Sequence, residues 1–137
     1  MRSSVALMIV ALVVFGSSLL ATTVTWTGAT DTDWHTASNW DLNIIPDLTT
    51  DVIISDVSGG SGNNPVFTVN AQTRDLHILA GGLLTAGAPF IVTGDWVNDG
   101  TFDAGSSLVT FAGSKQSEIS GNSVTIFNRL DIVKTGL

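Results

Sequence analysis

Short runs of β-branched and other apolar residues recur along the chain from residue 22 onward, and turn-forming residues separate them. The runs occupy residues 24–27, 51–55, 66–69, 76–79, 90–93, 108–111, 124–127 and 130–133. Between them lie segments rich in Gly, Asn, Asp and Ser, such as residues 58–64 and 98–100. β-Branched residues favour strands, whereas Gly, Asn, Asp and Ser favour turns. Many short strands with regular turn signals predict an all-β protein.

The second half of the chain repeats a unit made of a strand, a Gly or Asn corner, and a second strand. One copy runs from Val92 past Asn98 and Gly100, and another runs from Leu108 to Gly121. Such a unit cannot bury its apolar face alone, and stacking successive units buries one continuous core. The repeat therefore predicts a right-handed parallel β-helix, a form of β-solenoid, with a β-sandwich as the alternative. Because no capping element follows the last strand, we expect an open C-terminal edge and a chain truncated there.

The first residues follow the pattern of a secretory signal peptide. Arg2 gives a short positive region, residues 5–15 are uninterrupted apolar sequence, and small residues follow as far as Ala21. This order predicts a leader over residues 1–21 that is cleaved after Ala21, or alternatively after Ser18. The apolar stretch is close to the minimum length of a helix that spans a bilayer. An uncleaved membrane anchor is therefore the less favoured interpretation. We expect a secreted or outer-surface bacterial protein without a membrane span after cleavage.

Composition narrows the classes of function. Loss of Arg2 with the leader leaves four basic residues against twelve acidic ones, so the formal net charge moves from −7 to −8. Nucleic-acid binders cluster Lys and Arg against phosphates, and this balance argues against such a partner. The chain has no cysteine, which excludes disulfides, Cys-based zinc sites and a lipid-modified cysteine anchor.

A tryptophan motif marks the N-terminal half. It reads W-T-G-A-T-D-T-D-W-H-T-A-S-N-W over residues 26–40, and the segments Ile44–Pro46 and Asp51–Ile54 follow it. This segment resembles the opening module of large bacterial surface proteins: autotransporter-like and haemagglutinin-like β-helix proteins, and the long repeat proteins of Bacteroidetes-type bacteria. Residues 92–121 are similar to the rungs that follow in those proteins. The resemblance implies a Trp-rich N-terminal capping module over residues 22–64, solenoid rungs over residues 65–137, and an adhesive or structural role within a longer polypeptide.

The four tryptophans allow two interpretations. Trp26, Trp34 and Trp40 crowd one short segment, and Trp96 lies among the predicted rungs. The favoured interpretation is that they cover the first rung, because a solenoid edge needs a cap and Trp buries a large area. Exposed rings could instead stack on sugars. Trp34 and Trp96 are the candidate ligand-binding residues under that second interpretation.

Two sets of aspartates are candidate calcium ligands. One is Asp31, Asp33 and Asp41, and the other is Asp95, Asp99 and Asp103, spaced by four residues. Neither set matches an EF-hand loop, and residues 59–64 resemble only half of one calcium-binding nonapeptide repeat. Side chains of this kind usually bond their own backbone at turns. We therefore expect structural corners, with no metal and no cofactor.

No catalytic set is apparent in the sequence. Paired carboxylates cleave polysaccharides in many enzymes, but Glu118, beside Lys115, is the sole glutamate. His35 and His77 are far apart, and alternation places His77 on the outward side of a strand. No base, nucleophile and orienting partner can be named together, so we expect a protein that is not an enzyme.

The function that follows is an exported, cell-surface structural or adhesive segment of a larger bacterial protein. A carbohydrate-binding module is the alternative, and the non-catalytic N-terminal end of a polysaccharide-cleaving β-helix enzyme is a second alternative. The expected partners are an extracellular polysaccharide or a host or cell surface. Edge-to-edge self-association through the open end is also expected of an isolated fragment.

Overall fold

The computed structural model describes residues 20–136 and confirms the predicted all-β class. The strands are β1 (Thr22–Thr25), β2 (Thr50–Ile54), β3 (Val66–Phe67), β4 (Ala71–Thr73), β5 (Leu76–Ile78), β6 (Leu83–Ala86), β7 (Phe90–Val92), β8 (Trp96–Asn98), β9 (Thr101–Asp103), β10 (Leu108–Gly113), β11 (Ile119–Ser120) and β12 (Arg129–Lys134). A single 3₁₀ turn, η1 (Ala37–Asn39), accompanies them in this part of the chain. No helix within residues 20–136 has the length and apolar character needed to cross a membrane. The predicted leader, residues 1–21, lies outside the described residues apart from its last two positions, and it stays a prediction.

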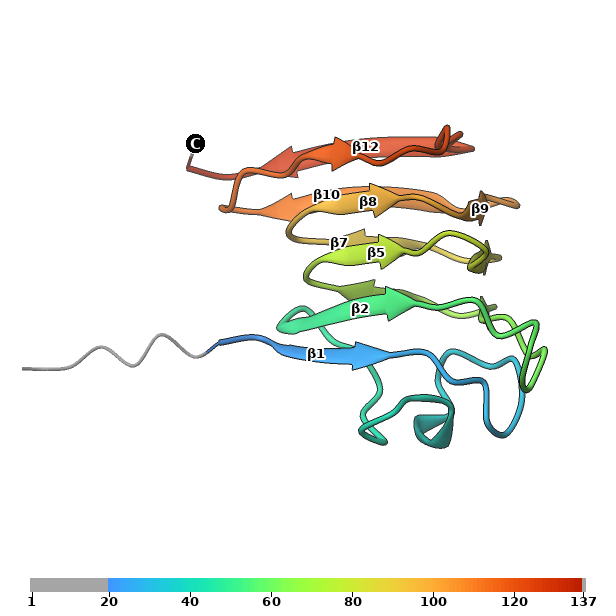
Figure 1. Cartoon of the computed structure of the whole chain (residues 1–137). Coiled ribbons are helices and arrows are strands. Elements are labelled where there is room, and N and C mark those ends of the chain that lie inside the picture. Colours follow the sequence, from blue (N-terminus) through green and yellow to red (C-terminus); the bar gives the residue numbers. More distant parts are fainter. Residues whose placement is uncertain (1–19, 137) are drawn as a thin grey trace, which may run out of the picture.

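The strands form three parallel sheets that surround one core (Figure 1). Face 1 has the order β1-β2-β5-β8-β11, face 2 has β3-β6-β9, and face 3 has β12-β10-β7-β4. From β2 to β10 the chain visits face 1, face 2 and face 3 in turn, and each circuit makes one coil; the last circuit passes from β11 on face 1 to β12 on face 3 without a strand on face 2. The result is about four stacked coils, which confirms the predicted β-solenoid. A sandwich is excluded, because its sheets pair antiparallel strands, whereas every pairing between these strands is parallel.

Alternation of apolar and polar residues decides which side chains enter the core. In β5, Leu76 and Ile78 are buried and His77 between them faces outward. The parallel register places Leu76 beside Val52 of β2 and beside Trp96 of β8, so one inward row continues from coil to coil. Because side chains alternate along a strand, each face presents such rows to the core. The core is therefore a set of stacked rows along the solenoid axis.

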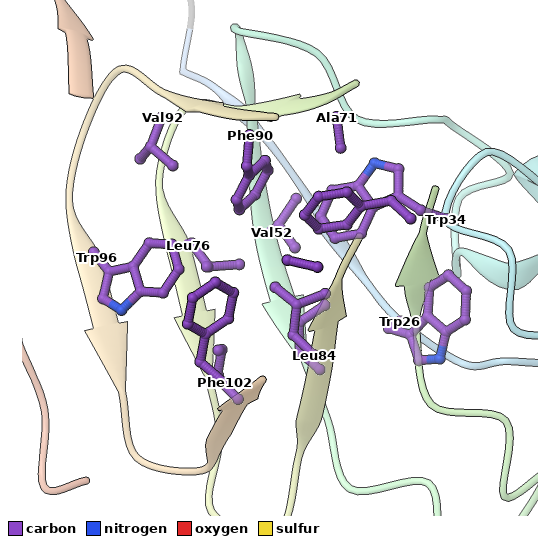
Figure 2. Packing of buried hydrophobic residues seen from close by; sticks show 14 of the residues in the cluster. Trp26, Trp34, Val52, Ala71, Leu76, Leu84, Phe90, Val92, Trp96 and Phe102 are labelled. Carbon is purple, nitrogen blue, oxygen red and sulfur yellow. The ribbon is translucent and has the colours of Figure 1, made fainter. Parts of the chain in front are cut away.

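Aromatic rings form a continuous column through these rows (Figure 2). Trp34 contacts Phe67 and Phe90 with ring centroids 5.7 and 5.6 Å apart, and Phe90 contacts Trp96 at 6.2 Å. Trp96 then meets Phe102 of the same coil at 4.8 Å. Most of these pairs are edge-to-face, the geometry that favours attraction between aromatic rings. The column links residues of every coil into one packed unit.

Residues 26–49 form a loop that closes the N-terminal end below β1 (Figure 1). Trp26 and Trp40 form an isolated antiparallel bridge, and their rings meet at 4.9 Å. Trp40 also packs on Trp34 at 4.8 Å, and its Nε1 donates a hydrogen bond to the Trp34 carbonyl. All three rings are buried. We call residues 26–49 the Trp cap.

The strand predicted at residues 124–127 is wrong. This segment has no strand in the structure, although it lies between the strands β11 and β12. Thr125 instead points its hydroxyl at the core, where it bonds Trp96 Nε1 at 3.2 Å and Asn98 Nδ2 at 3.0 Å. The segment is held by side-chain bonds rather than by a backbone ladder.

Candidate functional site

An acidic residue occupies the same outward position on successive coils of face 1. Each acid directly precedes an inward apolar residue, and the parallel register aligns these inward residues. We call this row the carboxylate ladder; its members are Asp51, Asp75, Asp95 and Glu118.

Backbone hydrogen bonds run up the carboxylate ladder from each coil to the next. The Asp75 N–H donates to Asp51 Oδ1 at 3.3 Å, and the Asp95 N–H donates to Asp75 Oδ1 at 2.7 Å. The Glu118 N–H donates to Asp95 Oδ1 at 3.0 Å. Asp51, Asp75 and Asp95 therefore each accept an amide proton from the coil above, in addition to the backbone pairing of the sheet.

Two cations neutralise part of this row. Arg74 makes a two-point contact with Asp51, through Nε at 2.6 Å and a terminal nitrogen at 2.5 Å. Lys115 Nζ lies between two coils, 3.0 Å from Asp75 and 3.1 Å from Asp95. A charged hydrogen bond of the Arg–carboxylate fork type is stronger than a neutral one and fixes the geometry. Both cations thus bridge neighbouring coils.

The same contacts shift the pKa values of Asp75, Lys115 and Arg74. Burial raises the pKa of Asp75, but the Asp95 N–H and the Lys115 ammonium outweigh burial and leave the pKa below its usual value. Burial lowers the pKa of Lys115, and its hydrogen bonds to Asp75 and Asp95 outweigh that effect and leave it raised. The hydrogen bond to Asp51 raises the pKa of Arg74. These contacts therefore favour the ionised forms of Asp75, Lys115 and Arg74.

A second outward row on face 1 is also bonded between coils. His77 Nε2 donates to Asp99 Oδ2 at 2.7 Å, and Asp99 Oδ1 accepts the Asn122 N–H at 2.8 Å. The hydrogen bond from His77 is the main cause of a lowered pKa at Asp99. The outward position predicted for His77 is correct, and this contact ties the coil of β5 to the coils above it.

A shallow groove of about 290 Å³ runs across the coils on face 1. Ile53, His77 and Val97 are paired neighbours in β2, β5 and β8. They line the groove together with the three lower members of the carboxylate ladder. It is a surface for contact rather than an enclosed cavity.

The expectation that Trp34 or Trp96 presents an exposed ring is wrong. Both side chains are 0 % exposed. Trp34 is enclosed by Trp40, Phe67 and Phe90, and Trp96 lies among the aromatic rings of three successive coils. A ring enclosed in this way has no face on which a sugar can stack, so neither residue is placed for the ligand-binding role considered above. Trp packing in the core is preferred because burial of so large an apolar ring is strongly stabilising.

The aspartates considered as calcium ligands hold the backbone or neighbouring side chains. Asp31 Oδ1 accepts the Asp33 N–H at 2.8 Å and Asn39 Nδ2 at 2.6 Å, and Asp41 accepts the Thr25 N–H at 2.9 Å. Asp103 bonds the N–H of Gly105 in its own corner at 3.1 Å. Within residues 20–136 no group of His, Asp and Glu side chains has the arrangement to hold a metal ion.

Asn39 is a structural residue whose importance the sequence did not reveal. It is fully buried in the Trp cap. Its Oδ1 accepts the N–H groups of Thr30 and Asp31 at 2.9 and 3.0 Å, and its Nδ2 donates to the Asp33 carbonyl at 2.9 Å. The side chain of Asn39 therefore replaces backbone pairing across the whole loop from Thr30 to Asp33.

Comparisons with known proteins place the chain in a family. A family model described as a domain of unknown function, DUF8693, matches residues 25–129. No curated protein matches the chain significantly, and no solved structure does so either. The match begins in β1 and ends at the start of β12, so it includes the Trp cap, the carboxylate ladder and nearly all of the solenoid. The chain belongs to the DUF8693 family.

Proposed function

We propose that this chain is an exported structural segment of a larger bacterial surface protein, in which the solenoid acts as a rigid spacer or adhesive stalk. The observation that carries the proposal is the carboxylate ladder. Its ionisable side chains bond from coil to coil, and Arg74 and Lys115 bridge the same coils. The charged groups on face 1 thus hold the stack together. Charged contacts between coils suit a structural role and involve no catalytic step.

The aromatic column supports the same role. Rings from the Trp cap to Phe127 of the last coil are in consecutive contact, with centroid distances between 4.8 and 6.2 Å. A densely packed interior transmits strain and has low compressibility. Bending the stack would separate aromatic rings and charged hydrogen bonds at the same time. The proposal therefore predicts a stiff segment.

Export and surface location are tested in a bacterial host with the full chain and its leader. We expect the mature protein to begin at Thr22, to leave the cytoplasm and to be accessible to protease on intact cells. Val10→Asp, which interrupts the apolar run of the leader, should keep the protein in the cytoplasm. Cytoplasmic retention of the unaltered chain with an uncut leader would contradict the proposal.

Carbohydrate binding stays a second candidate, and the groove on face 1 is the observation that favours it. Its apolar floor and flanking carboxylates could contact a linear polysaccharide lying across the coils. Val97→Asp would disrupt this floor, and Thr110→Asp, on the outward side of face 3, is a matched control. Binding to a polysaccharide array that Val97→Asp abolishes and Thr110→Asp leaves intact would establish this role, and equal binding by both variants would exclude the groove.

A further inference from the structure

The last coil leaves its core positions uncovered. Leu130 and Ile132 of β12 pair in register with Val109 and Phe111 of β10, which are buried and face the core. Leu130 and Ile132 therefore occupy core positions, yet they are 40 and 69 % exposed. Ile119 of β11 continues the inward row of Trp96 on face 1 and is 45 % exposed. This coil has the inward pattern of a middle coil and lies at the end opposite the Trp cap (Figure 1).

The outer edge of this coil has only part of the usual protection of an edge strand, because β12 carries outward charges at Arg129 and Asp131 but contains no proline. Natural sheets blunt an edge with outward charges, proline or a bulge. β12 pairs with β10 over six consecutive residues without a bulge. Lys134, which could guard the edge, turns back instead, and its Nζ donates to the carbonyls of Thr93 at 3.0 Å and Ala112 at 2.7 Å in the coils below. Lys115 also bonds downward, to Asp75 and Asp95.

The polar groups of the last coil are also left without some of the partners that the lower coils have. Every lower member of the carboxylate ladder accepts an amide proton from the coil above, and Glu118 is the highest member described. A pocket of about 170 Å³ lies beside it, lined mainly by Phe111, Ile119, Ile132 and Lys134. Ser117 Oγ, which also lines this pocket, is buried and has no hydrogen-bond partner within the described residues. A buried hydroxyl normally has a hydrogen-bond partner. The Glu118 carboxylate and the Ser117 hydroxyl can therefore each bond to a further coil.

We propose that this end of the solenoid is the docking face for one further parallel β-coil, supplied by the larger surface protein. The inference rests on the proposed function, because the larger surface protein is part of that proposal. The occupant has a defined chemistry: an acidic residue whose N–H reaches the Glu118 carboxylate, followed by an apolar residue above Ile119, and alternating apolar residues above Leu130 and Ile132. Each of these features continues an interface that already joins the coils below.

A second copy of the chain does not fit as well. Head-to-tail stacking is blocked, because the Trp cap closes the other end of the solenoid. A tail-to-tail dimer would reverse the strand direction at β12, whereas the amide-to-carboxylate ladder continues only between parallel strands in the same register. The geometry therefore favours a coil in the parallel sense.

The test adds a coil to the full chain and measures hydrogen exchange at β12. A copy of residues 114–136 is fused after Leu137, because this segment carries Glu118, Ile119, Leu130 and Ile132 in order. The control fusion has Ser in place of the copied Ile119, Leu130 and Ile132. In the unextended chain, the β12 amides that face the open end should exchange rapidly. In the first fusion they should exchange at least about tenfold more slowly, and in the control they should stay rapid.

Three outcomes would overturn the proposal: unprotected amides in the first fusion, equal protection in both fusions, or a concentration-dependent dimer of the unextended chain whose β12 amides are already protected. The last outcome, checked by sedimentation equilibrium, would identify a second copy as the occupant. Because exchange is measured on purified protein, it is independent of the export assay, and failure of one leaves the other result intact.

Discussion

Asp75 is the member of the carboxylate ladder whose removal should cost the most stability. Its Oδ1 accepts the Asp95 N–H at 2.7 Å and the Lys115 ammonium at 3.0 Å, and its Oδ2 lies 3.4 Å from Arg74. The side chain is 28 % exposed. Asp75→Ala removes the acceptor for the upper coil and one of the two carboxylates that hold Lys115.

The magnitude follows from these contacts. A hydrogen bond to a charged group contributes about 1.5–3 kcal/mol, and the half-exposed pair with Lys115 adds at most about 1 kcal/mol. We expect Asp75→Ala to lower the free energy of unfolding by about 2–3 kcal/mol at neutral pH. Asp75→Asn keeps an acceptor of the same shape and should lose about 1 kcal/mol. Asp103→Ala removes an acceptor that bonds only its own corner, so it should have a clearly smaller effect.

The pH dependence has a definite sign. Because the pKa of Asp75 is lowered in the folded protein, its contribution is complete above the unfolded pKa of about 3.9 and is lost as the pH falls through the folded pKa. Urea unfolding followed by Trp fluorescence at neutral and acidic pH measures both effects. The deficit of Asp75→Ala should shrink as the pH falls through the lowered folded pKa of Asp75. Equal losses for Asp75→Ala and Asp103→Ala, or a deficit that grows in acid, would refute the reasoning.

Three further substitutions test other parts of the fold in the same urea assay. Trp96→Ala should lose about 3–5 kcal/mol because the ring is fully buried, and weakened sugar binding at unchanged stability would contradict its core role. Gly121→Ala should cost more than Gly62→Ala: both glycines have positive φ, but a Cβ at Gly121 would collide with the coil below, whereas Gly62 has open space. Asn39→Ala should lose about 2 kcal/mol because two N–H groups of the Trp cap lose their acceptor. Asn39→Asp should lose at least as much, because a buried carboxylate would face the Asp31 carboxylate and the Asp33 carbonyl that now accept from Asn39 Nδ2.

Most of the solenoid could be predicted because its longer strands alternate apolar inward residues with polar outward ones. The predicted runs at residues 51–55, 90–93 and 108–111 correspond to β2, β7 and β10. Strands such as β4, with sequence A-Q-T, were missed because three residues of mixed character carry no alternation. They are strands because neighbouring coils pair with them, and a single-sequence pattern does not contain that information.

The candidate site was less predictable for two different reasons. The carboxylate ladder has a sequence signal, since D-V, D-L, D-W and E-I each occur at or next to the first residue of a strand of face 1. Unequal spacings of 24, 20 and 23 residues between the acids obscure this signal. The burial of Trp34 has no signal in the sequence. A Trp ring suits a core and a sugar site equally well, and the rings that enclose it, Phe67 and Phe90, come from later coils.

The position of the Trp cap has a consequence for how the molecule acquires its structure. Its residues precede all but the first strand in the chain, so a polypeptide that emerges N-terminus first can assemble this aromatic cluster before most of the coils exist. Each later coil then adds to a template already in place, closing a loop of only 20 to 24 residues. The entropy of closing such a loop varies only slowly with length, so no addition is much harder than the one before. Folding can thus proceed coil by coil from a nucleus at the N-terminal end, in the order in which synthesis delivers the chain.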